Sequence, residues 1–385
     1  DLALFLASRL GKDNFLPDDI IDSKSKWLLD AVSRECDLTK VRMAIDYSNT
    51  AKLETVPAEQ TLITSATKLK AFASCPFRYF AEYILKLKPR RIFELKPFSR
   101  GLFFHRVLEI LFDKLKQLHL TLSDTSADML SKLTDEAVEK LLVEDNFYKS
   151  FKSRSMHNSF IVHSEADIIK DAVLEFSQIA SAGNFRQIAC EIGFGSHAEL
   201  PPFELSLSNG RKVYLEGKID RLDVFSEKGN NYCLVIDYKT SEISMDWPLF
   251  FSGIDMQLPI YLLAVENQTV GSYSNLIPLG AFYLQIQAGL DSKAGLDELL
   301  GQSDKIRRKA KGIFNGEHSK LIDAKTHTGY SPYYNFRITN GDLQFGSYDS
   351  SSLLSDKHYE AMLTFAENKL RELALRILDG EIEIK

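Results

Sequence analysis

The chain has 385 residues, which at about 150 residues per domain is enough for two or three structural units with a hydrophobic core. Hydrophobic residues make up 44% and charged residues 26%, and neither Gly (20) nor Pro (11) is abundant. This composition excludes disordered, collagen-like and disulfide-scaffold chains. Lys and Arg number 47 against 53 Asp and Glu, for a net charge of -6. Any contact with nucleic acid must therefore come from a local basic surface.

The first 60 or so residues are mixed and polar, with a predicted helix near 26–36. They are too few for an independent catalytic domain. The start of the chain lacks both Met and a basic leader, and its apolar run is too short for a membrane span of about 20 residues. We therefore expect the cut end of a longer protein and no membrane partner.

Helical patterns dominate the next part of the chain. From Ser65 onward, apolar residues recur near helical spacing and are interrupted by a proline, which predicts two short helices meeting at Cys75–Pro76. Residues 101–118 predict a longer helix with His105 on a partly apolar face. Residues from about 124 to 185 show ordinary amphipathic patterns, which indicate a helical insertion without recognisable chemistry.

The pattern then changes to a period of two or to short apolar runs, which is typical of strands. Residues 257–266 predict a helix with proline in its first turn, and 359–380 predict a long amphipathic helix. The order predicts an α/β fold, a mixed sheet core flanked by helices. The predicted strands are 187–196, 203–208, 212–225, 232–239 and 279–286.

Two carboxylates, Asp220 and Asp237, fall on neighbouring predicted strands joined by a hairpin. Lys239 follows Asp237 by two residues, so both side chains project from one face of the strand. Charges beside a buried apolar strand are costly without a compensating partner. One interpretation is a structural Asp–Lys ion pair. The other is a site for Mg²⁺, which prefers oxygen ligands and needs only one or two protein carboxylates.

Four further residues are candidates with ordinary alternatives. His105 is either a core histidine or a metal ligand, and Glu191 is either a solvated strand residue or part of the site. Gln257 and Tyr261 are four residues apart on a predicted helix, so they face one side, either a cleft or the edge of the core. Each signal is weak alone.

In chain order these segments read GLFFH, GKIDRLD, VIDYKT and QLPIYLLA. This series resembles the PD-(D/E)xK nuclease superfamily, and specifically its RecB-type branch, found in bacterial recombination helicase-nucleases. The resemblance covers about residues 61–290 and implies a restriction-endonuclease-like sheet. The opening SATKLKAFASCPFRYFAEYILKLK is similar to the start of the nuclease domain in the B subunit of AddAB-type (RexAB-type) enzymes, which are exonuclease V-like.

The resemblance implies a role for each matching residue. Lys239 would be the catalytic lysine, with Gln257 and Tyr261 supporting the site and contacting the DNA. Arg221 and Asp223 are two apart on a strand and are expected to form a structural pair. The metal, Mg²⁺ or Mn²⁺, would be held by His105, Asp220, Asp237 and the backbone carbonyl of Tyr238, with Glu191 assisting through water or a second metal.

Cysteine usage gives a second expectation. Cys36, Cys75, Cys190 and Cys233 include no CxxC pair, so neither a zinc knuckle nor a disulfide framework can be inferred, and a reducing cytoplasm is the simplest setting. In the family that the sequence resembles, a cysteine at the position of Cys75 joins three near the C-terminus around a 4Fe–4S cluster. Either such a cluster belongs to the full-length protein only, which we favour, or this member lacks it and Cys75 is a buried small hydrophobic residue.

Basic residues concentrate between residues 86 and 106, interleaved with phenylalanines, and Arg90, Arg91 and Arg100 are the candidate DNA contacts. Cations follow phosphates and aromatic rings stack on unpaired bases. A second basic run at 305–311 is either another DNA-facing wall or a solvated face.

Three functions remain open from sequence. The first is a metal-dependent deoxyribonuclease domain, residues 61–385, preceded by the trailing piece of a helicase-like region, that cuts single strands unwound by an ATP-dependent helicase partner during double-strand break processing and recombinational repair. The second is a catalytically silent module of the same fold that guides a DNA strand. The third is an α/β domain with a structural ion pair. No GxxxxGK[ST] phosphate loop occurs, so this chain is not the motor as written.

Overall fold

The computed structural model of the chain describes residues 61–88, 99–241, 243–268, 275–287, 307–338 and 353–383. The helix predicted near 26–36 lies outside these ranges. Among the helices within them, none combines the length and the apolar composition that crossing a lipid bilayer requires.

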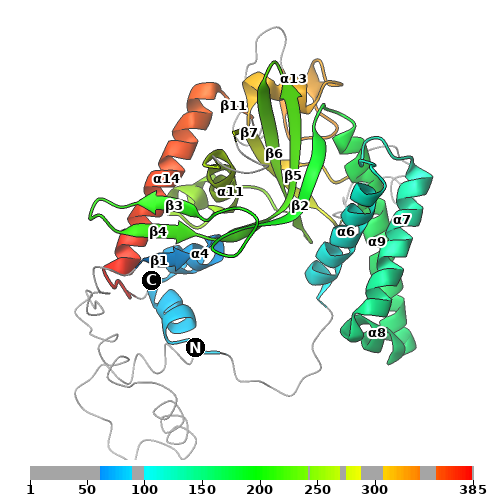
Figure 1. The fold of residues 1–385 in the computed structure, drawn as a ribbon, viewed down its shortest axis with the longest axis horizontal. Coiled ribbons are helices and arrows are strands. Elements are labelled where there is room, and N and C mark those ends of the chain that lie inside the picture. Colours follow the sequence, from blue (N-terminus) through cyan, green and yellow to red (C-terminus); the bar gives the residue numbers. More distant parts are fainter. Residues whose placement is uncertain are drawn as a thin grey trace, which may run out of the picture.

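A six-stranded sheet lies at the centre of the molecule, with the strand order β11-β8-β7-β6-β5-β2 (Figure 1). The pairs β6–β7 and β8–β11 are parallel and the other neighbours are antiparallel. The predicted α/β fold with a mixed sheet is confirmed. The strands are β2 (Arg186–Phe194), β5 (Gly217–Glu227), β6 (Asn230–Lys239), β7 (Leu276–Gln285), β8 (Lys311–Asn315) and β11 (Leu353–Leu354).

The prediction of one continuous strand over 212–225 is wrong. The chain instead changes sheets at Glu216, whose backbone N–H donates to the carbonyl of Thr64 at 2.9 Å. The residues before Glu216 belong to a separate three-stranded sheet of order β1-β4-β3. Its strands are β1 (Leu62–Thr64), β3 (Phe203–Ser206) and β4 (Lys212–Leu215).

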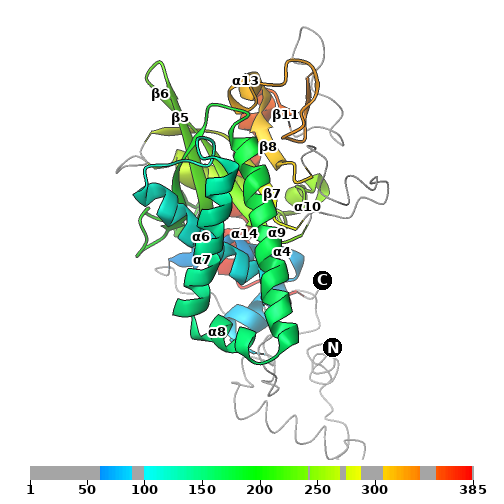
Figure 2. The ribbon, with the colours of Figure 1, turned by 90° about the vertical axis from the view of Figure 1, so that its right-hand side faces the viewer.

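Helices cover both faces of the central sheet (Figures 1 and 2). Neighbouring residues of β6 supply the two cores in turn: Val235 packs into one, and Leu234 and Ile236 into the other. The first core includes α4 (Ala66–Ser74), α11 (Gln257–Glu266) and α14 (Asp356–Leu378). The second includes α6 (Arg100–Gln117), α7 (Ala127–Glu144) and α9 (Met156–Ala180), with α8 (Asn146–Ser153) between the last two.

Serine side chains begin the long helices. Ser99, Ser126, Ser155 and Ser355 each accept a hydrogen bond from a backbone N–H in the first turn of α6, α7, α9 and α14, which satisfies a donor that the helix itself cannot pair. The helices α7, α8 and α9 lie within residues 124–185, where the sequence predicts a helical insertion.

The predicted break at Cys75–Pro76 is present. Cys75 has an extended backbone between α4 and α5 (Pro76–Tyr79), which continues as a π-helix over Phe80–Ile84. The N–H of Phe77 donates to the carbonyl of Glu383 at 3.1 Å, so the segment after α14 lies against this junction. The remaining short elements are α10 (Trp247–Ser252), a 3-10 turn (Gly316–His318), α13 (Ser319–Ile322), β9 (Gly329–Tyr330) and β10 (Arg337–Ile338).

Close approach of β7 and β8 gives a test of the fold. A Cβ added at Gly312 would overlap the carbonyl oxygen of Ala281 on β7, whereas a Cβ at Gly101 would meet only the Thr240 hydroxyl at 3.3 Å. We expect Gly312→Ala to lower the free energy of unfolding by about 1–3 kcal/mol through overpacking, measured by urea denaturation. Gly101→Ala, in the first turn of a helix, is the control and should have little effect. Equal stability of Gly312→Ala and the parent would contradict the described strand pairing.

Candidate active site

The two predicted carboxylates lie on adjacent strands. Asp220 belongs to β5 and Asp237 to β6, and the register pairs Arg221 with Ile236 between them. Both side chains are buried, and Asp237 is only 2% exposed. Asp220 Oδ2 accepts a hydrogen bond from the backbone N–H of Tyr238 at 2.7 Å. The strand pairing thus brings together two acids that are 17 positions apart in the sequence.

Lys239 and Gln257 surround Asp237. Lys239 Nζ lies 2.5 Å from Asp237 Oδ2 and donates to Gln257 Oε1 at 3.2 Å. The Gln257 amide in turn donates to Asp237 Oδ1 at 2.6 Å and to the Tyr261 hydroxyl at 3.0 Å. The prediction that Gln257 and Tyr261 face one side of their helix is confirmed. That side of the helix faces Asp237 and Lys239 of β6.

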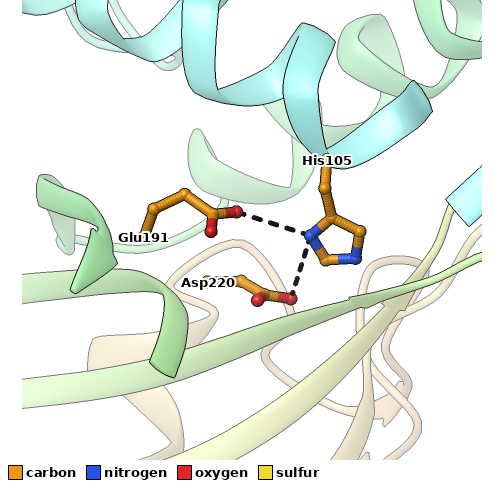
Figure 3. A group of neighbouring side chains, drawn as sticks. All are labelled: His105, Glu191 and Asp220. Carbon is orange, nitrogen blue, oxygen red and sulfur yellow. Dashed lines mark hydrogen bonds and ion pairs between the residues drawn. The ribbon is translucent and has the colours of Figure 1, made fainter. Parts of the chain in front are cut away.

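A histidine enters from the other helical layer. His105 of α6 places Nδ1 3.4 Å from Glu191 Oε1 and 3.7 Å from Asp220 Oδ2 (Figure 3). The possible ligand atoms of these three residues all lie within 4.8 Å of one another. Within the described ranges, no other group of three or more His, Cys, Asp or Glu side chains meets this condition. Asp237, predicted as a metal ligand, lies beside this group on β6 but is not a member of it.

The backbone of Glu191 is strained. Its φ is 55°, a left-handed conformation that costs a non-glycine residue about 1–3 kcal/mol. Its carboxylate is turned into the site, where Lys218 Nζ lies 2.5 Å from Oε2. Glu191 is therefore not a solvated strand residue. Lys218 was missed from sequence, although its position two residues before Asp220 puts it on the same strand face.

Burial raises the proton affinity of both aspartates. Burial raises the pKa of Asp220 to about 7, and the charge of Asp237 adds to this rise while His105 opposes it. Burial also raises the pKa of Asp237 against the influence of Lys239. Burial disfavours the charged form of His105, but the hydrogen bond to Glu191 and the charge of Asp220 outweigh it, so the pKa of His105 is raised. Burial is therefore the main reason that both aspartates hold protons more tightly than usual.

One atom tests whether a cation fits. Asp237 Oδ2 is buried, and its close contact is the Lys239 ammonium group 2.5 Å away. A buried carboxylate oxygen needs compensating positive charge. A divalent cation would supply it, and carboxylate oxygens with an imidazole are a suitable donor set for Mg²⁺ or Mn²⁺. The residues present therefore fit a divalent metal ion.

Behind the site, Tyr238 connects the sheet to the helices. Its ring stacks on Phe112 of α6 at 6.3 Å and on Phe176 of α9 at 5.4 Å. Its hydroxyl accepts a hydrogen bond from Arg221 at 3.4 Å, and Arg221 also binds Asp223 through two hydrogen bonds at 2.7 and 2.5 Å. The predicted Arg221–Asp223 pair is confirmed, and it is buried.

The described arginines of the two predicted basic surfaces form ion pairs with glutamates. Arg90 and Arg91 lie outside the described residues. Arg100 is half exposed but binds Glu165 of α9 at 2.6 Å. In the second basic run, Arg308 is buried and both its side chain and that of Arg307 bind Glu175. That run is therefore not an open cationic wall at these two positions.

The described cysteines do not form a cluster. Cys75, Cys190 and Cys233 are free, and the last two lie in β2 and β6. Among the described residues, no cysteine lies in a group of three or more side chains that could hold a metal ion. These residues alone do not fit an iron–sulfur cluster, and Cys36 lies outside the described ranges.

The sheet, the paired aspartates and the lysine two residues further on are the features of one nuclease class. Residues 63–385 match the family described as the PD-(D/E)XK nuclease superfamily, so the chain belongs to that superfamily.

Similar proteins are named as the B subunit of an ATP-dependent helicase/deoxyribonuclease. The protein of that name from Natranaerobius thermophilus is 29% identical over 95% of this chain and 32% of its own length. The one from Moorella thermoacetica is 29% identical over 83% of this chain and 28% of its own length. The one from Clostridium perfringens strain SM101 is 26% identical over 99% and 34%. The chain spans about a third of the length of these relatives.

Replacing Tyr238 by Phe tests the connection behind the site. The substitution keeps the ring but leaves Arg221 Nη1 without its buried acceptor, so we expect a loss of about 1–3 kcal/mol in the free energy of unfolding. Tyr359→Phe is the matched control for readout at the site, because Tyr359 is also buried and donates one hydrogen bond, to the carbonyl of Pro278 at 3.0 Å, in the other core.

Both variants should lose stability, but only Tyr238→Phe should perturb the titration of His105, followed by NMR. A His105 titration unchanged in Tyr238→Phe would contradict a connection between this side chain and the site.

Proposed function

We propose that this chain is the nuclease portion of the B subunit of a helicase-nuclease, and that it hydrolyses DNA phosphodiester bonds with a divalent metal. The observation that carries the proposal is the meeting of Asp220, Asp237 and Lys239 at one point of the sheet, with His105 beside them. A structural ion pair alone would not require a histidine and a third carboxylate, Glu191, at the same place.

The proposed ligands of Mg²⁺ or Mn²⁺ are Asp220, Asp237, His105 and the backbone carbonyl of Tyr238, with Glu191 as an assisting carboxylate. A bound divalent ion would lower the pKa of a coordinated water and neutralise negative charge on the phosphate. The raised proton affinity of Asp220 and the burial of Asp237 support this assignment, because added positive charge would stabilise both carboxylates.

The proposed catalytic lysine is Lys239. Its ammonium group lies between Asp237 and the Gln257 amide, so its position is fixed beside the buried acids. There it can orient the attacking water and stabilise the charge that develops on the phosphate. Gln257 and Tyr261 are proposed to hold Lys239 and Asp237 in place and to contact the DNA strand.

The proposed setting is a larger assembly. The names of the relatives support an ATP-dependent helicase partner and a DNA substrate. Single-stranded substrates, exodeoxyribonuclease activity and a role in DNA repair and recombination are proposed from the resemblance of the sequence motifs alone. A reducing cytoplasm is proposed because the three described cysteines are free thiols.

A 4Fe–4S cluster is proposed for the full-length protein only. It would need three cysteines besides Cys75 that the described part of this chain does not provide. The contact between Phe77 and Glu383 supports the idea, because it brings the segment after α14 beside the Cys75 junction.

Degradation of linear single-stranded DNA tests the function. We expect cutting with Mg²⁺ or Mn²⁺ and none with EDTA, and a loss of at least about 100-fold in Lys239→Ala and Asp237→Ala, because each removes a charge from the reacting centre. Lys228→Ala, at the exposed β5–β6 turn, is the matched lysine control and should cut like the parent.

The assay is run on the isolated chain and on the complete helicase-nuclease complex. Undiminished cutting by Lys239→Ala would contradict the site assignment. A folded parent that neither cuts nor binds metal in either form would favour the silent strand-guiding module.

A further inference from the structure

The tip of the helical insertion has an unusual charge pattern. No Asp or Glu occurs between Asp145 and Glu165, although acids outnumber bases in the chain as a whole. This interval covers α8 and the start of α9, and it carries Lys149, Lys152 and Arg154. We call these three residues the basic tip. Within the described part of the chain, no carboxylate forms an ion pair with them, unlike Arg100, Arg106 and Arg307.

Large apolar side chains are exposed on the same segment. Met156 is 91% exposed, Phe160 69% and Phe147 36%. The rings of Phe147 and Phe151 stack at 6.1 Å. Proteins bind single-stranded nucleic acid with exposed aromatic residues among cationic ones, because the cations bind phosphates and unpaired bases stack on the rings.

The tip is joined to the helix that carries His105. Tyr148 of α8 packs edge-on against Phe103 of α6, with ring centroids 5.4 Å apart. Burial raises the pKa of Tyr148 to about 12, Asp145 adds to the rise, and Arg106 is near enough to oppose it. Arg106 binds Glu109, whose charge in turn acts on Lys218 at the site. The contact between Tyr148 and Phe103 thus joins α8, at the end of the helical bundle (Figure 2), to the helix that carries His105.

We propose that the basic tip, with Phe147 and Phe160, binds single-stranded DNA and holds the strand that is cut at Asp237 and Lys239. This rests on the proposed function and adds a second point of contact outside the catalytic centre. A protein partner is the other occupant that an exposed apolar surface could take. The excess of unpaired positive charge favours a polyanion.

The experiment measures binding of a fluorescent oligothymidylate by anisotropy, with EDTA present so that no cutting occurs, over a range of salt concentrations. In the triple variant Lys149→Ala, Lys152→Ala, Arg154→Ala, the salt slope should fall by about 2, since each phosphate contact to a single strand contributes about 0.7. Phe160→Ala should weaken binding several-fold while leaving the slope unchanged, because it removes stacking and no charge.

The matched control removes the same charge elsewhere. Lys228, Lys320 and Lys357 are exposed at the β5–β6 turn, on α13 and at the start of α14, at the other end of the molecule from α8 (Figure 1). Their triple alanine variant should keep the parent's salt slope. An equal fall in both triple variants would mean that the tip has no specific role and would overturn the proposal.

Two outcomes separate this proposal from the proposed function. If the tip variant binds the oligonucleotide with the parent's slope but no longer assembles with the helicase partner, the surface is a protein interface and the DNA proposal is wrong. If the tip variant loses slope while the parent fails to cut DNA with Mg²⁺, the tip is a DNA surface and the nuclease assignment is the part that fails.

Discussion

Two buried carboxylates on neighbouring strands impose the main constraint on this structure. Asp220 and Asp237 are removed from water and repel one another, so each needs a partner. The Tyr238 N–H, the Lys239 ammonium and the Gln257 amide supply part of what is needed, and they come from β6 and from α11. Burial still disfavours the charged form of both acids, and a divalent cation would offset that cost.

The two helical layers contribute to the site from opposite sides of the sheet. Gln257 and Tyr261 belong to α11 in one layer, and His105 belongs to α6 in the other. Tyr238 lies between them: its backbone holds Asp220, and its ring packs against both α6 and α9. The helical insertion is therefore coupled to the site through packing, and its far end offers the unpaired cations proposed to hold DNA.

Local sequence pattern was sufficient for the centre of the site but not for its surroundings. Strand periodicity puts Asp237 and Lys239 on one face, and helical periodicity does the same for Gln257 and Tyr261. The strands β8 and β11 were missed because one follows a run of basic residues and the other is only two residues long. The pairing of Arg308 with Glu175 joins residues 133 positions apart, and no local pattern contains such a contact. Only the family resemblance predicted that His105 and Glu191 both belong to the site, because each residue alone had an ordinary alternative.

The most direct test of the metal site is a crystal structure of the protein grown with Mn²⁺, with anomalous scattering recorded at the manganese edge. The account predicts an anomalous peak in contact with the carboxylates of Asp220 and Asp237 and with the His105 ring. It also predicts that the peak disappears in Asp220→Asn. A structure with no peak there, in which Lys239 Nζ still lies against Asp237 Oδ2, would contradict the central claim that the buried acids form a metal site.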